Sequence, residues 1–400
     1  MRTIAVVGAS LAGLRAAEAL RREGFDGRII AIGEEPHLPY DRPPLSKELL
    51  AGVWEPEQIV LRRQGVDDLD LDWRLDARAI RLDARAREVE LHDGEVVRFD
   101  GLVIATGATP RRLPNQPSMA GLCMLRTLDD ALALRELLDA RPKVVVIGAG
   151  FIGSEVAATC RTRGLDVTVL EALPQPLVRG LGSELGAVLG AIHRDHGVDL
   201  RTGAAVDAIV GNGIVEGVRL ADGSLVAADV VVVGVGVVPQ TSWLEGSGLT
   251  LDNGVVCDAT CRAAPGIVAA GDVARWPNPL FDGELMRLEH WTNATEQGVH
   301  AASTLLAGED GGKPFAPVPF VWSDQYDHKI QTVGVVSADA ELHIAHGTLA
   351  DRRFVALFGK YGRIVGALGF SRPRHVMQYR RMIGERASWG DALAKAREGA

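Results

Sequence analysis

The sequence predicts an α/β protein with two similar parallel-sheet domains followed by a third, α+β domain. An apolar run, a glycine-rich turn and a small-residue helix pattern begin at residue 4, and the same order returns at residue 144. Each helix pattern leads to a second apolar run, at residues 29–32 and 167–170. Strand, helix and strand in this order form the unit of a parallel sheet. From about residue 317 the pattern changes to separate apolar runs followed by basic helices.

The composition is that of an ordinary globular protein with an excess of glycine. The 400 residues are 47% hydrophobic and 24% charged, and 46 of them are glycine, above the usual share of about 7%. The formal net charge of -9 argues against a nucleic-acid-binding protein, which is usually strongly basic. The longest apolar run is too short to span a membrane, and the N-terminal residues show no signal-peptide pattern. We therefore expect a cytoplasmic protein without a membrane segment.

The first predicted domain begins with a strand at residues 4–7 and a helix that runs to Leu20. An alternating pattern broken at Asp93-Gly94 then predicts a hairpin. A buried strand at residues 102–104 runs into the small-residue turn Ala105-Thr106-Gly107. This order of elements is typical of a dinucleotide-binding domain.

The second predicted domain repeats this order. A strand at residues 144–147 and a helix lead to further strands, with hairpin turns at residues 211–213 and 222–223. A strand at residues 230–233 then runs into Gly234-Val235-Gly236. The repeat predicts two Rossmann-like, dinucleotide-binding domains of similar architecture.

The chain then returns to the first sheet, because a strand pattern ends in Gly271-Asp272. The proline-rich stretch at residues 313–319 predicts a linker, and the apolar runs at 331–336, 354–358 and 364–368 predict strands of the third domain. The expected division is a discontinuous first domain (1–108 and 238–316), a second domain (109–237) and a C-terminal α+β domain (317–400).

Both glycine-rich turns have the spacing of the dinucleotide fingerprint. The second turn, which runs from Gly148 to Gly153, is complete, whereas the first has Ser10 in place of the middle glycine. In this motif the first glycine makes the turn, the second admits the pyrophosphate and the third allows close helix–strand packing. The phosphates then meet the N-terminus of the helix. Because two such turns recur in the same context, we favour nucleotide binding over two incidental tight turns.

An acidic residue follows each fingerprint at the end of the next strand. These residues are Glu34 and Glu171, near the position from which a carboxylate binds a ribose hydroxyl. Such a carboxylate repels a 2′-phosphate. The second site is therefore predicted to prefer NADH to NADPH.

These motifs resemble those of the two-dinucleotide-fold flavoproteins, a family that includes glutathione reductase. The resemblance implies FAD in the first site and a nicotinamide nucleotide in the second. Most members pass electrons through a Cys-x4-Cys disulfide, but this sequence has no cysteine before Cys123. In that region the segment 39–47 resembles the oxygenase-coupled NADH:ferredoxin reductases, of the putidaredoxin reductase and biphenyl or toluene dioxygenase reductase type. The resemblance covers essentially the whole chain. It includes the motifs Leu125-Arg126-Thr127, Gly271-Asp272-Val273-Ala274, 289–293 and Trp322-Ser323-Asp324-Gln325.

The resemblance implies residues for both cofactors and for catalysis. The implied FAD contacts are Gly8, Ser10, Leu11, Ala12, Gly13, Glu34, Arg42, Lys47, Ala79, Ala105, Thr106, Gly107, Arg126, Gly271, Asp272 and Trp291. The implied NADH contacts are Gly148, Gly150, Phe151, Ile152, Gly153, Glu155, Glu171 and Gly236. The implied catalytic residues are Pro44, Lys47, Glu155 and Trp322.

Each of these roles has a structural alternative. Lys47 can stabilise a reduced, anionic flavin ring or be a solvated lysine at a helix start, and Asp272 can bind a ribityl hydroxyl or cap a helix. Glu155 is implied to lie near the nicotinamide and to pair with the flavin-side lysine, but its position is equally that of an exposed helical acid. Trp322 is expected either between the flavin and the partner protein or in a hydrophobic core. Relatives often carry a second tryptophan where this chain has Phe320.

The cysteines and histidines predict no metal site. Cys123 and Cys160 are isolated, whereas Cys257 and Cys261 form a Cys-x3-Cys pair, which is not the thioredoxin spacing and has no second pair to complete a zinc site. The role of this pair stays open. The few, scattered cysteines require no oxidising compartment.

The resemblance implies an FAD-dependent enzyme that passes electrons from NADH, one at a time, to a [2Fe-2S] ferredoxin serving a cytochrome P450 or a Rieske dioxygenase. Alternatives are a rubredoxin reductase, an NADH oxidase or peroxidase, and a regulatory flavoprotein similar to apoptosis-inducing factor. Ferredoxins are usually acidic, so the ferredoxin is expected to dock transiently on a basic patch, although a solvated helical face also explains these arginines. The candidates are Arg62, Arg63, Arg372, Arg374, Arg380 and Arg381.

Overall fold

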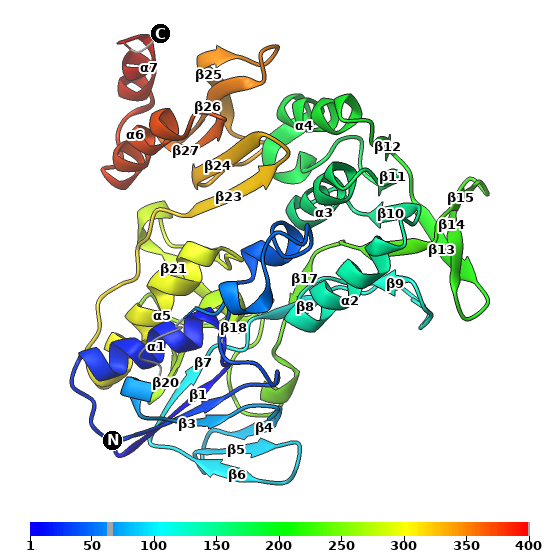
Figure 1. Cartoon of the computed structure of the whole chain (residues 1–400). Coiled ribbons are helices and arrows are strands. Elements are labelled where there is room, and N and C mark those ends of the chain that lie inside the picture. The colour runs from blue at the N-terminus through cyan, green and yellow to red at the C-terminus, as the bar shows by residue number, and fades with distance from the viewer. Residues whose placement is uncertain (62–66, 399–400) are drawn as a thin grey trace. The chain divides into compact units, whose positions relative to one another are not determined.

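The computed structural model describes residues 1–61 and 67–398, which fold as two compact units (Figure 1). The units alternate along the chain, so neither is continuous in sequence. The first unit comprises Met1–Asp41, Ile59–Thr109 and Val238–Pro319, and the second comprises Arg42–Gln58, Pro110–Val237 and Phe320–Ala400. The expected division into three domains stays a prediction.

A six-stranded, mainly parallel sheet forms the centre of the first unit. In spatial order its strands are β19 (Arg262–Ala264), β20 (Ile267–Ala269), β7 (Gly101–Ile104), β1 (Thr3–Val7), β2 (Arg28–Ile32) and β3 (Leu71–Arg74). β20 pairs in parallel with β7, so the chain returns to the first sheet as predicted. β1 and β7 are buried almost along their whole length, which explains why both are continuous apolar runs rather than alternating ones.

Two helices, α1 (Leu11–Arg22) and α5 (Trp291–Leu306), pack against each other and against this sheet. Their backbones come close together at one point. A Cβ atom added to Gly298 of α5 would lie 2.4 Å from the carbonyl oxygen of Ala12 in α1. The glycine therefore lets α5 lie directly on the first turn of α1.

Smaller strands complete the first unit. One antiparallel sheet contains β4 (Ala79–Asp83), β5 (Glu88–Leu91) and β6 (Val96–Arg98). Its β5–β6 connection contains Asp93-Gly94, which confirms the predicted hairpin. A second sheet contains β18 (Val255–Val256), β21 (Ala274–Asn278) and β22 (Glu284–Met286), and two short strands, β8 (Ala108–Pro110) and β17 (Val237–Pro239), pair separately.

The second unit contains a five-stranded parallel sheet of the same kind. In spatial order its strands are β12 (Asp199–Thr202), β11 (Val167–Glu171), β10 (Val144–Ile147), β16 (Val230–Val233) and β9 (Leu122–Cys123). The helices of this region are α2 (Leu128–Asp139), α3 (Phe151–Thr162) and α4 (Val178–Asp195). The strands β13 (Val206–Gly211), β14 (Val215–Leu220) and β15 (Leu225–Ala227) form the two predicted hairpins. The repeat seen in the sequence is thus a repeat of structure.

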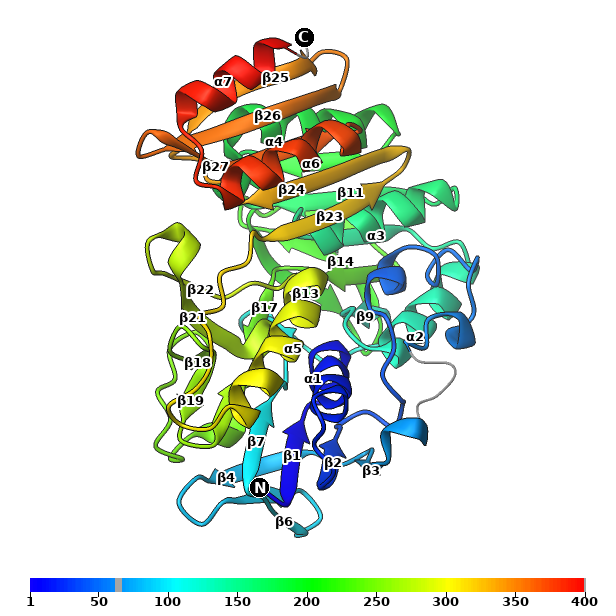
Figure 2. The same cartoon turned by 90° about the vertical axis from the view of Figure 1, so that its left-hand side faces the viewer.

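The C-terminal part of the second unit is a five-stranded antiparallel sheet covered by two helices (Figure 2). Its strands, in spatial order, are β23 (Phe320–Gln325), β24 (His328–Gly334), β27 (Arg363–Phe370), β26 (Arg353–Lys360) and β25 (Glu341–Thr348). The helices are α6 (Pro373–Gly384) and α7 (Trp389–Glu398). The predicted apolar runs correspond to β24, β26 and β27. The two edge strands gave no such run, because polar side chains interrupt both.

Several short 3-10 helices connect these elements. They are η1 (Pro43–Ser46), η2 (Pro56–Gln58), η3 (Asp67–Leu69), η4 (Ser242–Leu244), η5 (Gly271–Val273) and η6 (Pro279–Phe281). Within the described residues, no helix is both long enough and apolar enough to cross a membrane.

Candidate active site

The first glycine-rich turn joins β1 to α1, and the protein itself requires both of its glycines. Gly8 has a φ of +121°, and a Cβ atom there would lie 2.0 Å from the carbonyl oxygen of Ala105. A Cβ atom on Gly13 would lie 2.0 Å from the carbonyl oxygen of Gly8. Ser10, in place of the middle glycine, is extended and precedes α1 without making a side-chain capping bond. The turn therefore keeps the close packing of the motif and adds a hydroxyl at its centre.

The second turn joins β10 to α3 and has the same construction. Gly148 has a φ of +100°, and its Cβ atom would lie 2.4 Å from the carbonyl oxygen of Gly234. A Cβ atom on Gly153 would lie 2.1 Å from the carbonyl oxygen of Gly148. Gly150 differs, because its φ is -75° and a Cβ atom there would meet nothing within 4 Å. The fold does not need a glycine at this position, so the open space beside its backbone fits the approach of a pyrophosphate.

The two acidic residues lie at the ends of equivalent strands. Glu34 follows β2 and is exposed, with one carboxylate oxygen 4.0 Å from Nε of Arg78. Glu171 ends β11, and its carboxylate accepts hydrogen bonds from the backbone N–H groups of Ala149 and Leu173, both at 2.8 Å. The charge of Glu171 is therefore fixed beside the second glycine-rich turn, and its contact with a ribose stays a prediction.

Other predicted FAD residues of the first unit lie at strand ends and turns. Thr106, two residues after the end of β7, donates from Oγ1 to the carbonyl oxygen of Gln240 at 2.9 Å, and Gly107 has a φ of +69°. Ala79 begins β4, and Leu11 and Ala12 are buried in the first turn of α1.

Gly271 and Asp272 form η5 at the end of β20. The residue at the N-cap of η5 is Ala270, so Asp272 does not occupy the N-cap position of this short helix. Trp291 begins α5, and its indole N–H donates to Oδ1 of Asp41 at 2.5 Å. The contacts of these residues with FAD stay predictions.

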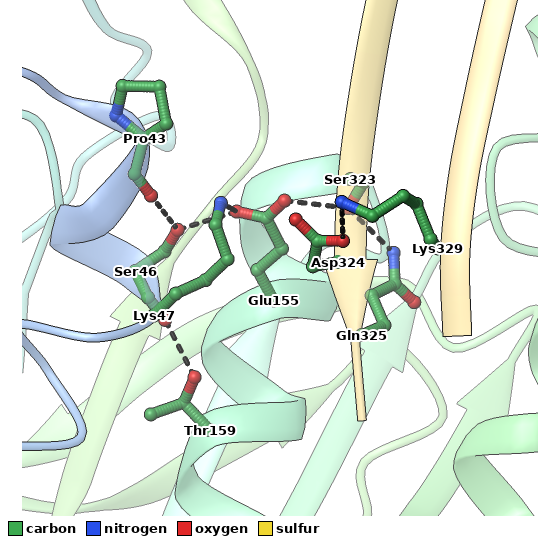
Figure 3. A network of polar contacts seen from close by, with 9 residues as sticks. All are labelled: Pro43, Ser46, Lys47, Glu155, Thr159, Ser323, Asp324, Gln325 and Lys329. Carbon is green, nitrogen blue, oxygen red and sulfur yellow. Dashed lines mark hydrogen bonds and ion pairs between the residues drawn. The ribbon is translucent and has the colours of Figure 1, made fainter. Parts of the chain in front are cut away.

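In the second unit, a buried ion pair joins Lys47 to Glu155 (Figure 3). Nζ of Lys47 lies 2.8 Å from Oε2 of Glu155, and the two side chains are only 15% and 3% exposed. The alternatives of a solvated lysine and an exposed helical acid are therefore both wrong. Burial of a charge is costly unless it is paired and hydrogen-bonded, so this arrangement needs further donors on the carboxylate.

Two serines supply these donors. Ser46 donates from Oγ to Oε2 of Glu155 at 2.5 Å, and Ser323 donates to Oε1 at 2.6 Å. Thr159, one turn after Glu155 on α3, donates to the carbonyl oxygen of Ser46 at 2.7 Å and so ties η1 to α3. In Figure 3, Glu155 lies between Ser46 and Lys47 on one side and Ser323 of β23 on the other. Sequence reasoning missed both serines, although each stands within a motif that carried the resemblance.

The proline pair of η1 sets the position of Ser46 and Lys47. Pro43 and Pro44 occupy the first helical positions, where a missing backbone N–H costs nothing. The backbone N–H of Lys47 then donates to the carbonyl oxygen of Pro44 at 3.1 Å. Pro44 is buried within this turn, and its catalytic role stays a prediction.

Trp322 and the other predicted residues of the second unit lie on several elements. Trp322, on β23, is only partly buried and stacks on Phe320 with ring centroids 5.9 Å apart, so it is not a core residue. Arg42 donates from Nη1 to the carbonyl oxygen of Arg126 at 2.5 Å. The remaining NADH residues are Phe151 and Ile152, which begin α3, and Gly236, which follows β16 with a φ of +95°.

The cysteine pair lies in a core rather than at a reactive site. Cys257 and Cys261 are both buried, and neither forms a disulfide. Burial raises the pKa of Cys261 to about 12 and the pKa of Cys257 well above its usual value, so both remain protonated thiols. Among the described residues, no group of three His, Cys, Asp or Glu side chains could hold a metal ion.

Comparisons with known proteins agree with this geometry. The family model described as pyridine nucleotide-disulphide oxidoreductase matches residues 2–298, and the model described as reductase C-terminal matches residues 320–397. Rhodocoxin reductase of Rhodococcus erythropolis is 38% identical over 386 residues, which are 95% of this chain and 89% of that protein. The ferredoxin–NAD(+) reductase component of the biphenyl dioxygenase system of Paraburkholderia xenovorans is 36% identical over 96% of this chain and 94% of its own length.

A solved structure is similar over the full length. The reductase in the crystal structure of the covalent putidaredoxin reductase–putidaredoxin complex has a TM-score of 0.92 and 30% sequence identity, and the match covers 100% of this chain and 99% of that chain. The predicted resemblance and the predicted α/β fold are both confirmed. The two glycine-rich turns, the C-terminal sheet and these matches together show that the chain belongs to the pyridine nucleotide-disulphide oxidoreductase family, as a member that carries the reductase C-terminal domain.

Proposed function

We propose that this protein is an FAD-dependent NADH:ferredoxin reductase, which passes electrons one at a time to a [2Fe-2S] ferredoxin that serves a cytochrome P450 or a Rieske dioxygenase. The observation that carries the proposal is the occurrence of two glycine-rich turns of one construction in a chain whose first cysteine is Cys123. A protein that binds two nucleotides but has no dithiol near the first site fits an electron acceptor that takes one electron at a time. The relatives' names, which include reductase components of dioxygenase systems, support the acceptor class.

The first turn supplies the residues that would hold FAD. The exposed carboxylate of Glu34 would accept a hydrogen bond from a ribose hydroxyl, and Asp272 would accept one from the ribityl chain. The helix α1 would direct its N-terminal N–H groups at the pyrophosphate. FAD, when bound, accepts a hydride and releases single electrons. Arg42, Lys47 and Arg126 belong to the second unit, and their role toward FAD is carried only by the resemblance.

The second turn supplies the residues that would hold NADH. The open space at Gly150 would admit the pyrophosphate, and Glu171 would accept a hydrogen bond from a ribose hydroxyl. Ile152 is 49% exposed at the first turn of α3, where it offers apolar surface to the nucleotide. The fixed charge of Glu171 favours NADH over NADPH.

The Lys47–Glu155 pair would serve the reaction by holding a buried positive charge in one place. Glu155 and its serine donors keep the ammonium group of Lys47 from turning toward solvent. A fixed, preorganised cation stabilises charge that develops nearby without having to reorient. No proton transfer by either side chain is needed for this role.

The ferredoxin would dock on the exposed side of α6. Arg374 is exposed there, and Arg380 lies over the ring of Phe320 at 5.9 Å. Arg381 pairs with Glu385 at 2.7 Å, so its charge is partly compensated. Two further candidates, Arg62 and Arg63, lie outside the described residues. The unbonded cysteines are consistent with a cytoplasmic location, which we also propose.

The test is a steady-state comparison of three acceptors with NADH as donor: a [2Fe-2S] ferredoxin, a rubredoxin and oxygen. The proposal expects the ferredoxin to be reduced fastest, with NADH strongly preferred to NADPH. Faster reduction of rubredoxin would identify a rubredoxin reductase. If neither iron protein were reduced faster than oxygen, an NADH oxidase or a regulatory flavoprotein would replace the proposal.

A further inference from the structure

A row of buried polar side chains continues from Glu155, on the side away from Lys47, toward α4. Ser323 donates to Oε1 of Glu155, and Nε2 of Gln325 donates to Oγ of Ser323 at 3.2 Å. The phenol oxygen of Tyr326 lies 3.0 Å from Nδ1 of His193. Ser323, Gln325 and His193 are all at most 1% exposed. All these residues belong to the second unit, and Figure 3 shows its first part.

The donors in the first part of this row can point in one direction only. A carboxylate accepts hydrogen bonds and donates none, so the hydroxyl hydrogen of Ser323 is directed at Glu155. Oγ of Ser323 must then accept, which requires the amide nitrogen of Gln325 and fixes the orientation of that amide. Oε1 of Gln325 is left on the far side as an acceptor.

The far end of the row offers a matching donor. Oε1 of Gln325 and Nε2 of His193 are both buried, and neither has a hydrogen-bond partner among the described residues. The two side chains are neighbours, since burial lowers the pKa of His193 to about 4 and the nearby Gln325 side chain partly opposes this shift. A neutral imidazole carries a single N–H. A hydrogen on Nε2 of His193 would give a partner both to Nε2 and to Oε1 of Gln325.

We propose that His193 is a positioning residue for Glu155: it is the Nε2–H tautomer, and it acts through Gln325 and Ser323 in a chain of donors that ends on the carboxylate. In this chain Tyr326 donates to Nδ1 of His193. The inference rests on the proposed function, because it gives the Lys47–Glu155 pair a role toward the cofactors.

The physical consequence is that the whole row stabilises one negative charge. Donors that all point the same way polarise each other, so each bond toward Glu155 is strengthened by the one behind it. The row also crosses several elements: α3 carries Glu155, β23 carries Ser323 and Gln325, and α4 carries His193. The C-terminal sheet is therefore part of the arrangement that holds the carboxylate, and Tyr326 in the β23–β24 turn anchors its end.

The direct test is nitrogen NMR of the His193 ring in the FAD-loaded protein at neutral pH, assigned by its loss in His193→Gln. We expect a protonated Nε2 and an unprotonated Nδ1. The opposite tautomer would overturn the proposal whatever the enzyme reduces. If the protein reduced no ferredoxin but Nε2 of His193 carried the proton, the proposed function would be wrong and the proposed row of hydrogen-bond donors would still be supported.

The kinetic test is the rate of flavin reduction by NADH in Ser323→Ala and Ser323→Thr. Loss of the hydroxyl should lower the rate at saturating NADH about tenfold and leave the dissociation constant of NADH unchanged, and the threonine variant should recover most of the rate. Ser224→Ala, which removes a hydroxyl from an exposed turn of the same unit, is the matched control and should show no effect. Equal losses in the alanine and threonine variants, or a loss confined to NADH binding, would overturn the positioning role. If Ser323→Ala fails to fold, the tautomer of the unmodified protein still decides.

Discussion

Substitution of Gly150 by alanine should separate NADH binding from folding. The residue precedes α3 with a φ of -75° and a ψ of -177°, a conformation that alanine adopts without strain. Its added methyl group would meet no protein atom within 4 Å. The same substitution at Gly153 would bring the methyl group to 2.1 Å from the carbonyl oxygen of Gly148. One motif therefore contains a glycine needed by a ligand and a glycine needed by the fold.

The expected effect on stability is small. Alanine is a poorer N-cap than glycine by about 0.5 kcal/mol, but it also reduces the conformational entropy of the unfolded chain, which contributes about 0.4–1 kcal/mol in the opposite direction. These contributions nearly cancel, so the Tm should change by no more than about 2 °C.

The expected effect on NADH is much larger. The methyl group would fill the space that the pyrophosphate needs and keep it from the N–H groups of α3. Loss of one hydrogen bond to a charged group costs about 1.5–3 kcal/mol, which corresponds to a weakening of NADH binding by about 10- to 100-fold.

The assay is a titration of the FAD-loaded protein with NADH under anaerobic conditions, together with thermal unfolding. Gly180→Ala is the matched control, because it also adds a methyl group in open space, on α4, and should leave NADH binding unchanged. Gly153→Ala should unfold at a clearly lower temperature. The reasoning is refuted if Gly150→Ala binds NADH as well as the unmodified protein, or if it is destabilised as much as Gly153→Ala.

Three further predictions address charge. Glu171→Arg should lower the preference for NADH over NADPH by at least tenfold in kcat/KM, and an unchanged ratio would show that Glu171 does not contact the ribose. Because burial lowers the pKa of His193 to about 4, the unfolded chain binds a proton between pH 6.5 and 4 that the folded protein does not. The free energy of unfolding should thus fall by about 2 kcal/mol from pH 7.5 to pH 5 on account of this group, and denaturant titrations of His193→Gln should show a smaller fall. Arg374→Glu should slow ferredoxin reduction most at low salt without changing flavin reduction by NADH, and equal losses in both half-reactions would contradict a docking role.

The fold of the two dinucleotide-binding regions could be predicted from the sequence because the patterns that indicate it are local. Gly8 and Gly148 both need a positive φ, and the apolar runs of β1 and β10 are short strands buried on both sides. The edge strands β23 and β25 of the C-terminal sheet carry no comparable signal. Charged and other polar side chains interrupt their apolar residues, so only pairing with β24 and β26 defines them as strands.

The sequence by itself determined the chemistry that this protein carries: two nucleotide turns with an acid behind each, and no dithiol near the first. Only the tertiary structure decided which individual polar side chains are buried and which partners they contact. Glu155 could have been an exposed helical acid, since helical periodicity does not tell which face a distant segment covers. It is buried because Ser46 and Ser323, 109 and 168 residues away along the chain, bring hydroxyl donors to its carboxylate. A buried charge is stable only where such donors meet it, and their meeting depends on chain segments that local patterns cannot connect.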